Sequence, residues 1–305
     1  MRISCVEKIV VYAIGGNALS SPTVFDKSKT ALVLANVLSD VIDLLEAGWQ
    51  VVLTHGNGPQ VGHLMSLDSD QPMDEWVAAT QGMIGHTIAL NLDSILRRRN
   101  RPESTSVVLT RVKVDSEDKA FKYPIKPVGR ILTDKQVMEE DWDIAETVNG
   151  PRRVVASPKP VEILDINVIK ALLSSRSIVI CCGGGGIPVI ENENQLSGVP
   201  AVIDKDHLSS MLAVDLNASA LIISTAVDGL KKDFATSMQT DIPSIKSSEA
   251  QKLLDVGHFP PGSMGPKVQA LIDAVSKDSS MKCIICSPGN ALKALRGESG
   301  TSVVA

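Results

Sequence analysis

Short apolar runs alternate with longer stretches of helical periodicity along most of the chain. The apolar runs have the length of buried strands, and we expect strands at residues 8–14, 50–53, 106–109, 177–182, 220–224 and 281–286. Between them, apolar residues recur at helical spacing, which predicts helices at residues 28–48, 75–99, 160–175, 207–218, 247–257, 266–277 and 290–297. This alternation predicts an α/β fold, in which a mostly parallel sheet is covered by helices on both faces.

Residues 112–154 break this pattern. The segment is polar, contains several prolines and shows little periodicity. Because a structureless loop of this length is unusual inside a compact domain, we expect the segment to form a small protruding subdomain.

The composition is that of an ordinary globular protein. The 305 residues leave room for one large α/β domain or two lobes, and only 3% are aromatic, so we expect an aliphatic core. A net charge of -5 argues against a nucleic-acid partner, which favours a basic surface. The apolar runs stay shorter than the roughly 18 residues of a membrane span, so we expect a cytoplasmic protein that makes no membrane contact.

The cysteines give a weak signal for a metal or redox site. Cys181 and Cys182 are adjacent, and Cys283 and Cys286 form a CxxC, all within β-like runs. Residues three apart on a strand point to opposite faces, so Cys283 and Cys286 are poorly placed to share a metal. Buried thiols are the better interpretation. The histidines do not fall at metal-ligand spacing either, and we expect no metal site built by the protein.

Four glycine-rich stretches follow predicted strands, at residues 15–17, 54–62, 182–188 and 261–267. Glycine lets the backbone approach an anion closely, and Pro59 suits the first turn of a helix whose N-terminus would face such a loop. Any one stretch can be merely a tight connection, but four together favour a phosphate-handling site. The sequence lacks GxxxxGK[ST], the GxGxxG dinucleotide fingerprint and the protein-kinase motifs, so we expect a different nucleotide-binding scheme.

The charged triplet Asp204-Lys205-Asp206 follows an apolar run and opens a predicted helix. The simple interpretation is that Asp206 is an N-cap and Lys205 a solvated surface charge. The functional interpretation is that Lys205 neutralises a transferring phosphoryl group and that Asp206 holds it in place. Lys126 and Lys267 stand beside prolines that fix the backbone, although either can be a surface lysine.

Eight motifs in this order resemble one known family: "AIGGNAL", "LTHGNGPQVG", "ATQGMIG", "KPVGR", "SPKPVEI", "GGGGIPVI", "AVIDKD" and "GSMGPKV". Together they resemble carbamate kinase, a member of the amino acid kinase fold group. The resemblance implies a three-layer α/β/α sandwich around a largely parallel sheet. It implies an N-terminal lobe (1–215) that binds carbamate or carbamoyl phosphate, with a lid at about 112–154, and a nucleotide-binding lobe (216–305). It also implies a homodimer and a reversible reaction of carbamoyl phosphate with ADP, often in arginine breakdown.

The resemblance also implies roles for individual residues. The residues implied to bind the substrate are Gly15, Gly16, Asn17, Gly56, Asn57 and Gly58. The catalytic residues are Lys126, Lys205, Asp206 and Lys267, and the nucleotide-binding ones are Thr225, Asp228, Met264, Gly265 and Lys267. In this scheme backbone N–H groups cradle the carbamoyl phosphate, Asp206 orients the lysines, and Lys126 reaches in from the lid. Mg²⁺ enters with ADP or ATP.

This chain departs from the family pattern in four places, which include "DKDHL" in place of "DKDLA" and "SSPTVFD" after "GGNAL". It also reads "YPIKP" where the family usually reads "NPTKP", and "TAVDGLKKDF" where the family has "TDVD". Two other functions therefore stay open. One is a different small-molecule kinase of the same fold, although relatives acting on amino-acid carboxylates usually carry a lysine at the position of Ala13. The other is a ligand-binding homologue that has lost turnover.

Overall fold

An eight-stranded sheet forms the centre of the molecule. The computed structural model describes residues 8–15, 27–67, 71–147, 150–232, 239–260 and 262–305 of the chain. The strand order is β15-β17-β16-β12-β1-β2-β9-β3. Neighbouring strands in these ranges run parallel, with the exception of the antiparallel pair β16–β17. In chain order the strands are β1 (Lys8–Ile14), β2 (Trp49–His55), β3 (Ser104–Val107), β9 (Ser177–Ile180), β12 (Ala220–Ser224), β15 (Ser244–Lys246), β16 (Lys282–Cys286) and β17 (Thr301–Val304).

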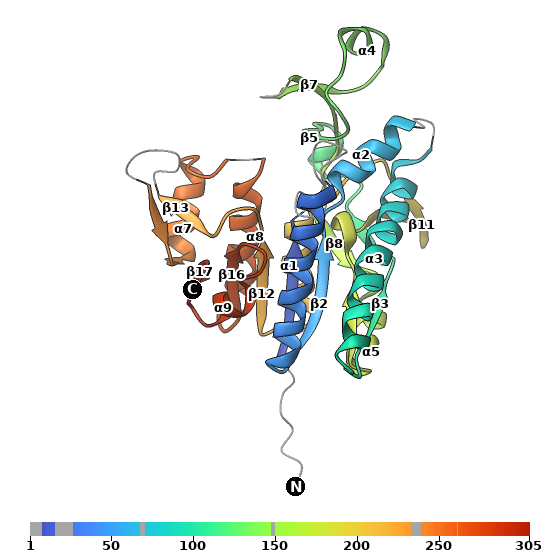
Figure 1. Cartoon of the computed structure of the whole chain (residues 1–305). Coiled ribbons are helices and arrows are strands. Elements are labelled where there is room, and N and C mark those ends of the chain that lie inside the picture. The colour runs from blue at the N-terminus through green and yellow to red at the C-terminus, as the bar shows by residue number, and fades with distance from the viewer. Residues whose placement is uncertain (1–7, 16–26, 68–70, 148–149, 233–238, 261) are drawn as a thin grey trace.

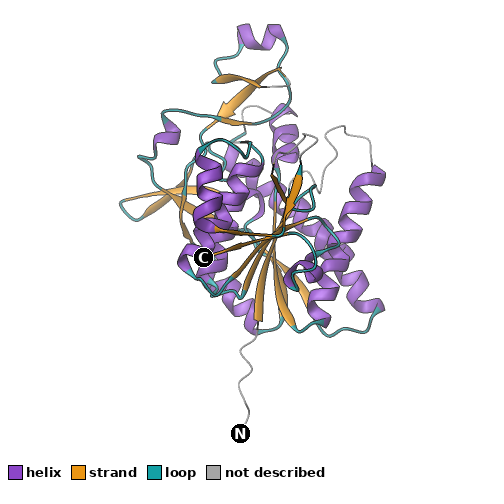
Figure 2. Cartoon of the chain, turned by 90° about the vertical axis from the view of Figure 1, so that its left-hand side faces the viewer, coloured by secondary structure: helices purple, strands orange, loops and turns teal. Residues whose placement is uncertain are grey.

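Helices cover both faces of this sheet, so the fold is the expected three-layer α/β/α sandwich (Figure 1, Figure 2). Successive residues of β1 show the two layers: Val11 and Ala13 pack in one hydrophobic cluster, whereas Val10 and Tyr12 pack in the other. One face carries α5 (Ile166–Ser174), α6 (Lys205–Asp215), α7 (Ser247–Asp255) and α8 (Met264–Lys277). The other carries α1 (Lys27–Glu46), α3 (Met73–Arg98) and α9 (Ala291–Leu295). No helix in the described ranges is both long and apolar enough to cross a membrane.

The central strands of the sheet are buried on both faces, which explains why their sequences are largely apolar. Such strands read as unbroken apolar runs, and the predicted ranges 8–14 and 220–224 coincide with β1 and β12. Cys283 and Cys286 fall in different hydrophobic clusters on the two sides of β16, and both are free and buried. Their interpretation as buried thiols is confirmed.

Smaller sheets surround the central one. A four-stranded sheet has the order β11-β10-β4-β8, and a hairpin pairs β13 with β14. Their bounds are β4 (Arg111–Val114), β8 (Pro160–Ile163), β10 (Ile187–Asn192), β11 (Gln195–Gly198), β13 (Leu230–Lys232) and β14 (Thr240–Ile242). The prediction of a helix over the whole of 160–175 is wrong at its start. Pro160–Ile163 instead form β8, which pairs antiparallel with β4, and the helix begins only at Ile166.

A protruding part rises from the body near α2 (Gly58–Leu67), as Figure 1 shows. It contains β5 (Lys126–Pro127), α4 (Asp134–Glu139), β6 (Ile144–Thr147) and β7 (Gly150–Val155), and its sheet order is β5-β7-β6. The earlier residues of the 112–154 range differ, because β4 pairs with β8 and β10 in the body and is followed by a short 3₁₀ helix, η2 (Lys119–Phe121). The predicted lobe boundary at residue 215 falls at the end of α6, before β12, and the central sheet has strands from both sides of it.

Candidate active site

A cavity of about 490 Å³ lies beyond the carboxyl ends of the central strands. Parallel α/β sheets bind ligands at this edge. The residues that directly follow β1, β2 and β12 line it, and they include Gly15, Gly56 and Thr225. The N-terminal turns of α6 and α8 supply Lys205 and Lys267. The topology therefore brings segments far apart in sequence to one cavity.

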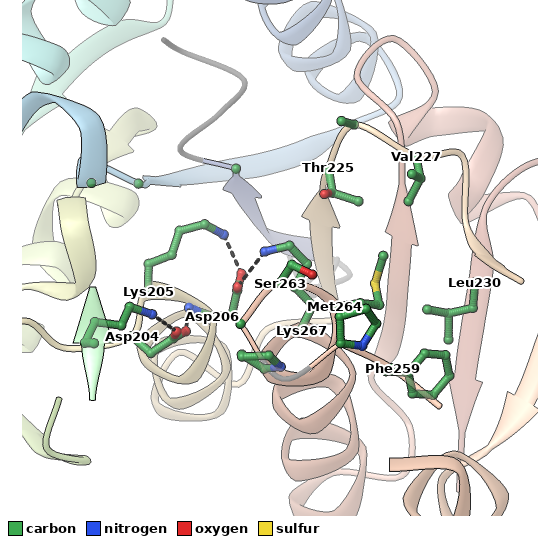
Figure 3. Close-up of a pocket in the computed structure, with 18 of the residues that line it drawn as sticks. Asp204, Lys205, Asp206, Thr225, Val227, Leu230, Phe259, Ser263, Met264 and Lys267 are labelled. Atoms are coloured by element: carbon green, nitrogen blue, oxygen red, sulfur yellow. Dashed lines mark hydrogen bonds and ion pairs between the residues drawn. The ribbon is translucent and has the colours of Figure 1, made fainter. Parts of the chain in front are cut away.

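The centre of the site is the buried carboxylate of Asp206, which holds two ammonium groups (Figure 3). Oδ1 accepts a hydrogen bond from Lys205 Nζ, and Oδ2 accepts one of 2.8 Å from Lys267 Nζ. The side chains of the two lysines are only 10% and 15% exposed. Because each oxygen binds a different lysine, Asp206 fixes the separation of two positive charges beside the cavity.

Burial and charge act against each other within this cluster. Burial raises the pKa of Asp206, but the attraction of Lys205 and Lys267 outweighs it and the pKa lies below its usual value. Burial also lowers the pKa of Lys205, and neighbouring Lys267 adds to that effect, whereas Asp206 opposes it. The cluster is thus an ionised carboxylate that holds two largely buried lysines beside the cavity, where they can bind an anion.

A second ion pair joins the protruding part to the same helix. Lys126 Nζ of β5 donates to Asp204 Oδ2 at 2.8 Å. Asp204 Oδ1 accepts from the Asp206 backbone N–H at 2.9 Å, so Asp204 is the N-cap of α6. The simple interpretation of Asp206 as the N-cap is therefore wrong. The cap lies two residues earlier, which leaves the Asp206 carboxylate free to hold the lysines.

The Asp204–Lys126 pair predicts a pH-dependent contribution to stability. Burial alone would raise the pKa of Asp204, but Lys126 holds it well below the usual range. The pair therefore stabilises the fold above the unfolded-state pKa of about 3.9, and its contribution fades as the pH falls below that value. Asp204→Asn keeps the cap and is expected to lower the free energy of unfolding by about 1 kcal/mol at pH 7, because the Lys126 side chain is 35% exposed and partly screened. Urea titrations at pH 7 and pH 3 should show this difference shrinking at pH 3, and a constant difference would contradict the assignment.

Two backbone N–H groups of the glycine-rich loops, those of Gly15 and Gly56, make hydrogen bonds within the sheet, whereas they were expected to bind an anion. The Gly15 N–H donates to Ser224 O at 3.0 Å, and the Gly56 N–H donates to Ile14 O at 3.1 Å. These two N–H groups extend the sheet ladder and are not turned toward an anion, although both glycines line the cavity. Asn57 and Gly58 also line it, at the start of α2, where the first N–H groups have no partner within the helix. Gly16 and Asn17 lie outside the described residues.

The "CGGGGIP" stretch is mainly a packing device. It forms the short 3₁₀ helix η3 (Gly183–Gly185), and only Gly184 of the four glycines lines the cavity. A Cβ on Gly185 would lie 2.0 Å from Ile203 O, and one on Gly184 would lie 2.1 Å from Asn57 Nδ2. Gly184 also has φ of +64°, which favours glycine. These glycines let the loop fit against the segments that carry the site.

Gly184→Ala is therefore expected to displace Asn57 and to lower the free energy of unfolding by at least about 2 kcal/mol. The matched control is Gly82→Ala on α3, where an added Cβ meets nothing within 4 Å. That substitution should be neutral or slightly stabilising, because alanine favours a helix. Denaturant unfolding of the two variants tests the comparison, and equal stability would contradict it.

Several residues that shape the site were not predicted from the sequence. Asn57 Nδ2 donates to Thr80 Oγ1 at 2.9 Å, and Gln81 bonds both the Thr110 backbone and Gly183 O. Thr80 and Gln81 are fully buried on α3 within the motif "ATQG". The signal available in the sequence was a pair of polar residues at positions that helical periodicity places on the buried face.

The residues implied to bind the nucleotide divide into two groups. Thr225 and Met264 line the cavity, beside an apolar wall that includes Val227, Leu230 and Phe259 (Figure 3). Asp228 and Gly265 are not among the lining residues. The Asp228 carboxylate accepts a hydrogen bond of 2.6 Å from Ser287 Oγ, and the Gly265 N–H donates to Pro260 O. Their roles toward a nucleotide stay predictions.

The cavity offers no carboxylate cage for Mg²⁺ among the described residues. Both oxygens of Asp206 and both of Asp204 already accept hydrogen bonds, and no group of three His, Cys, Asp or Glu residues in those ranges is placed to hold a metal. Magnesium is often held mainly by substrate phosphates and water. The donor set therefore does not fit a resident ion, and magnesium would have to arrive on the nucleotide.

Comparison with known proteins identifies the family. The model of the amino acid kinase family matches residues 8–287. A carbamate kinase of Clostridium perfringens is 40% identical over 97% of this chain and 99% of its own length, and one of Pyrococcus horikoshii is 39% identical over 96% and 98%. The solved structure of carbamate kinase from Giardia lamblia bound to AMP-PNP is similar with a TM-score of 0.88 and 35% identity, covering 98% of this chain and 99% of that chain. The resemblance drawn from the eight motifs is confirmed: the chain belongs to the amino acid kinase family, and within it to the carbamate kinases.

Proposed function

We propose that this protein transfers a phosphoryl group reversibly between carbamoyl phosphate and ADP, giving carbamate and ATP. In the ATP-forming direction, an oxygen of the ADP β-phosphate bonds to phosphorus while the bond from phosphorus to the carbamoyl oxygen breaks. Carbamate leaves as an anion. Such a reaction needs positioning and charge neutralisation more than covalent chemistry.

The observation that carries this proposal is the pair of lysines on one buried carboxylate. Lys205 and Lys267 lie beside a cavity at the carboxyl end of a parallel sheet, with Asp206 fixing both. Two ammonium groups held apart in a poorly solvated site suit the charge that develops on a phosphoryl group between donor and acceptor oxygens. Lys126 lines the same cavity from the protruding part, which we propose acts as a lid.

The remaining parts of the cavity fit two substrates. On one side Asn57 and Gly58 stand at the N-terminus of α2, where we place carbamoyl phosphate. On the other side the apolar wall of Val227, Leu230 and Phe259 gives a nucleobase a surface to pack on. Thr225 and Met264 lie on this side, where we propose that ADP binds with its Mg²⁺ and reaches Lys267. We also propose that the enzyme is a cytoplasmic homodimer, as its relatives are expected to be.

The alternative of an amino-acid kinase is less well supported. Relatives of that kind are expected to carry a lysine at the position of Ala13, whereas here Ala13 is fully buried in the hydrophobic cluster beneath the cavity. A ligand-binding homologue without turnover is disfavoured by the intact Asp206 cluster.

A coupled assay of ATP formation tests the proposal. ATP should form from carbamoyl phosphate and ADP only when Mg²⁺ is present, because we propose that the metal enters the site on the phosphates of ADP. A protein that forms no ATP, yet melts at a higher temperature with either ligand, would be a binding homologue. Transfer from ATP to an amino-acid carboxylate, without turnover of carbamoyl phosphate, would establish the other kinase activity.

A further inference from the structure

A buried carboxylate outside the cavity forms a second polar cluster. Asp40 of α1 is 1% exposed, although its surroundings are mainly apolar. It accepts hydrogen bonds from Tyr12 Oη at 2.6 Å, from the Gly289 N–H at 2.7 Å and from the Ala291 N–H at 2.9 Å. The three donors come from β1 and from the turn that opens α9, so Asp40 joins three segments of the fold.

One branch of this cluster reaches the carboxyl ends of two central strands. Tyr12 Oη also lies 3.2 Å from Ser224 Oγ, the last residue of β12. The carbonyl oxygen of Ser224 accepts from the Gly15 N–H, and the next residue, Thr225, lines the cavity. The Tyr12–Asp40 bond therefore lies directly behind the point where β1 and β12 enter the site.

The other branch reaches the loop that follows β12. Asn290, between the two backbone donors to Asp40, donates from Nδ2 to Ser287 Oγ at 3.0 Å. Ser287 Oγ donates in turn to Asp228 Oδ1 at 2.6 Å. Of loop residues 225–229, all except Asp228 line the cavity. Asp228 is therefore the residue that turns away from the cavity to fasten the loop.

This loop is fastened at both ends as well as in the middle. At its start the Thr225 N–H donates to Cys286 O at 2.9 Å, and just past its end the Leu230 N–H donates to Thr301 Oγ1 at 2.8 Å. Both end anchors use neighbouring strands of the central sheet. The middle anchor, Asp228–Ser287, instead depends on a turn whose backbone N–H groups are held by Asp40.

We propose that Asp40 is a positioning residue for nucleotide binding: it holds the 287–291 turn so that Ser287 can fix Asp228 and keep loop 225–229 shaped against ADP. The proposal rests on the function proposed above, because it places ADP beside this loop. Asp40 touches neither substrate in this scheme. It acts through Ser287 and Asp228 and leaves the Asp206 cluster unchanged, so its loss affects the nucleotide more than carbamoyl phosphate.

Asp40→Asn tests the proposal in steady-state kinetics of ATP formation. The amide presents an NH₂ group where one carboxylate oxygen accepted hydrogen bonds, and the loss of a charge-assisted bond of this kind is worth about tenfold. We expect the KM for ADP to rise about tenfold, with the KM for carbamoyl phosphate and kcat each changed less than about threefold. Asp43→Asn is the matched control, since it makes the same change one turn further along α1, and within the described part of the chain the Gly289 and Ala291 N–H groups donate to Asp40 and not to Asp43. It should leave both KM values unchanged.

Ser287→Ala tests the same anchor closer to the surface, where misfolding is a smaller concern. It should raise the KM for ADP about threefold, and adding it to Asp40→Asn should produce little further rise, because both variants break one chain of contacts. A merely structural role for Asp40 would instead raise both KM values together or lower kcat at unchanged KM, and either result overturns the proposal. A wild-type protein that forms no ATP would refute the proposed function alone. Calorimetric binding of ADP to the wild type and to Asp40→Asn would then decide the positioning role.

Discussion

Alanine in place of Lys205 is expected to lower kcat for ATP formation at least a hundredfold. The Lys205 ammonium is nearly buried, is held by Asp206 and lines the cavity. A positioned charge in such a site can stabilise a transition state by about 2.7–4 kcal/mol, because no water has to reorganise around it. The KM for ADP should change much less, since Lys267 and the loop after β12 remain in place.

The expected loss depends on the place of the lysine and not on net charge. Lys277→Ala, an exposed lysine at the end of α8, should leave kcat unchanged and serves as the control. Lys205→Arg should recover little activity, because a planar guanidinium does not replace a compact ammonium at a fixed position. Initial rates at saturating ADP and carbamoyl phosphate make the measurement. A Lys205→Ala enzyme with a near-normal kcat would remove this residue from the mechanism.

The fold could be predicted from the sequence largely where strands are buried on both faces. The runs that became β1 and β12 are unbroken and apolar, and their bounds were predicted to the residue. The peripheral strands were not predicted, because they lack a long unbroken apolar run. β13, β14 and β15 span three residues each, and β8 combines a proline with one buried and one exposed apolar residue, so none has a run long enough to read.

The site was less accessible to sequence reasoning, because its geometry arises between helices. Asp206 and Lys267 are 61 positions apart and meet because α6 and α8 pack side by side on one face of the sheet. Local sequence patterns marked both as candidates, and only the resemblance to carbamate kinase implied that Asp206 orients Lys267. The glycines were over-interpreted: the sequence pattern indicated anion binding at glycines that serve packing. A glycine that makes room for a neighbour, as Gly185 does for Ile203, has the same local pattern as one that presents its N–H to an anion.

Asparagine in place of Asp206 is expected to be the most damaging single change to the site. One oxygen becomes an NH₂ group that cannot accept from a lysine, so Lys205 and Lys267 lose their shared counter-ion while remaining buried. Removing one member of a buried ion pair typically costs about 3–5 kcal/mol of folding free energy. Activity should fall at least as far as in Lys205→Ala, because both ammonium groups lose their fixed positions. Asp273→Asn, on the exposed surface of α8, is the control for the same chemical change.

The pH dependence separates this explanation from a simple loss of packing. Asp206 is the main group that raises the pKa of Lys205 against burial and the repulsion of Lys267. Without it the folded-state pKa of Lys205 falls further below the unfolded value of about 10.4, so the unfolded chain binds more protons than the folded one. The free energy of unfolding of Asp206→Asn should therefore rise more steeply between pH 7 and pH 9 than that of the wild type. Urea titrations across this range measure the slope, and parallel slopes would show that Asp206 does not hold the charge of the buried lysines.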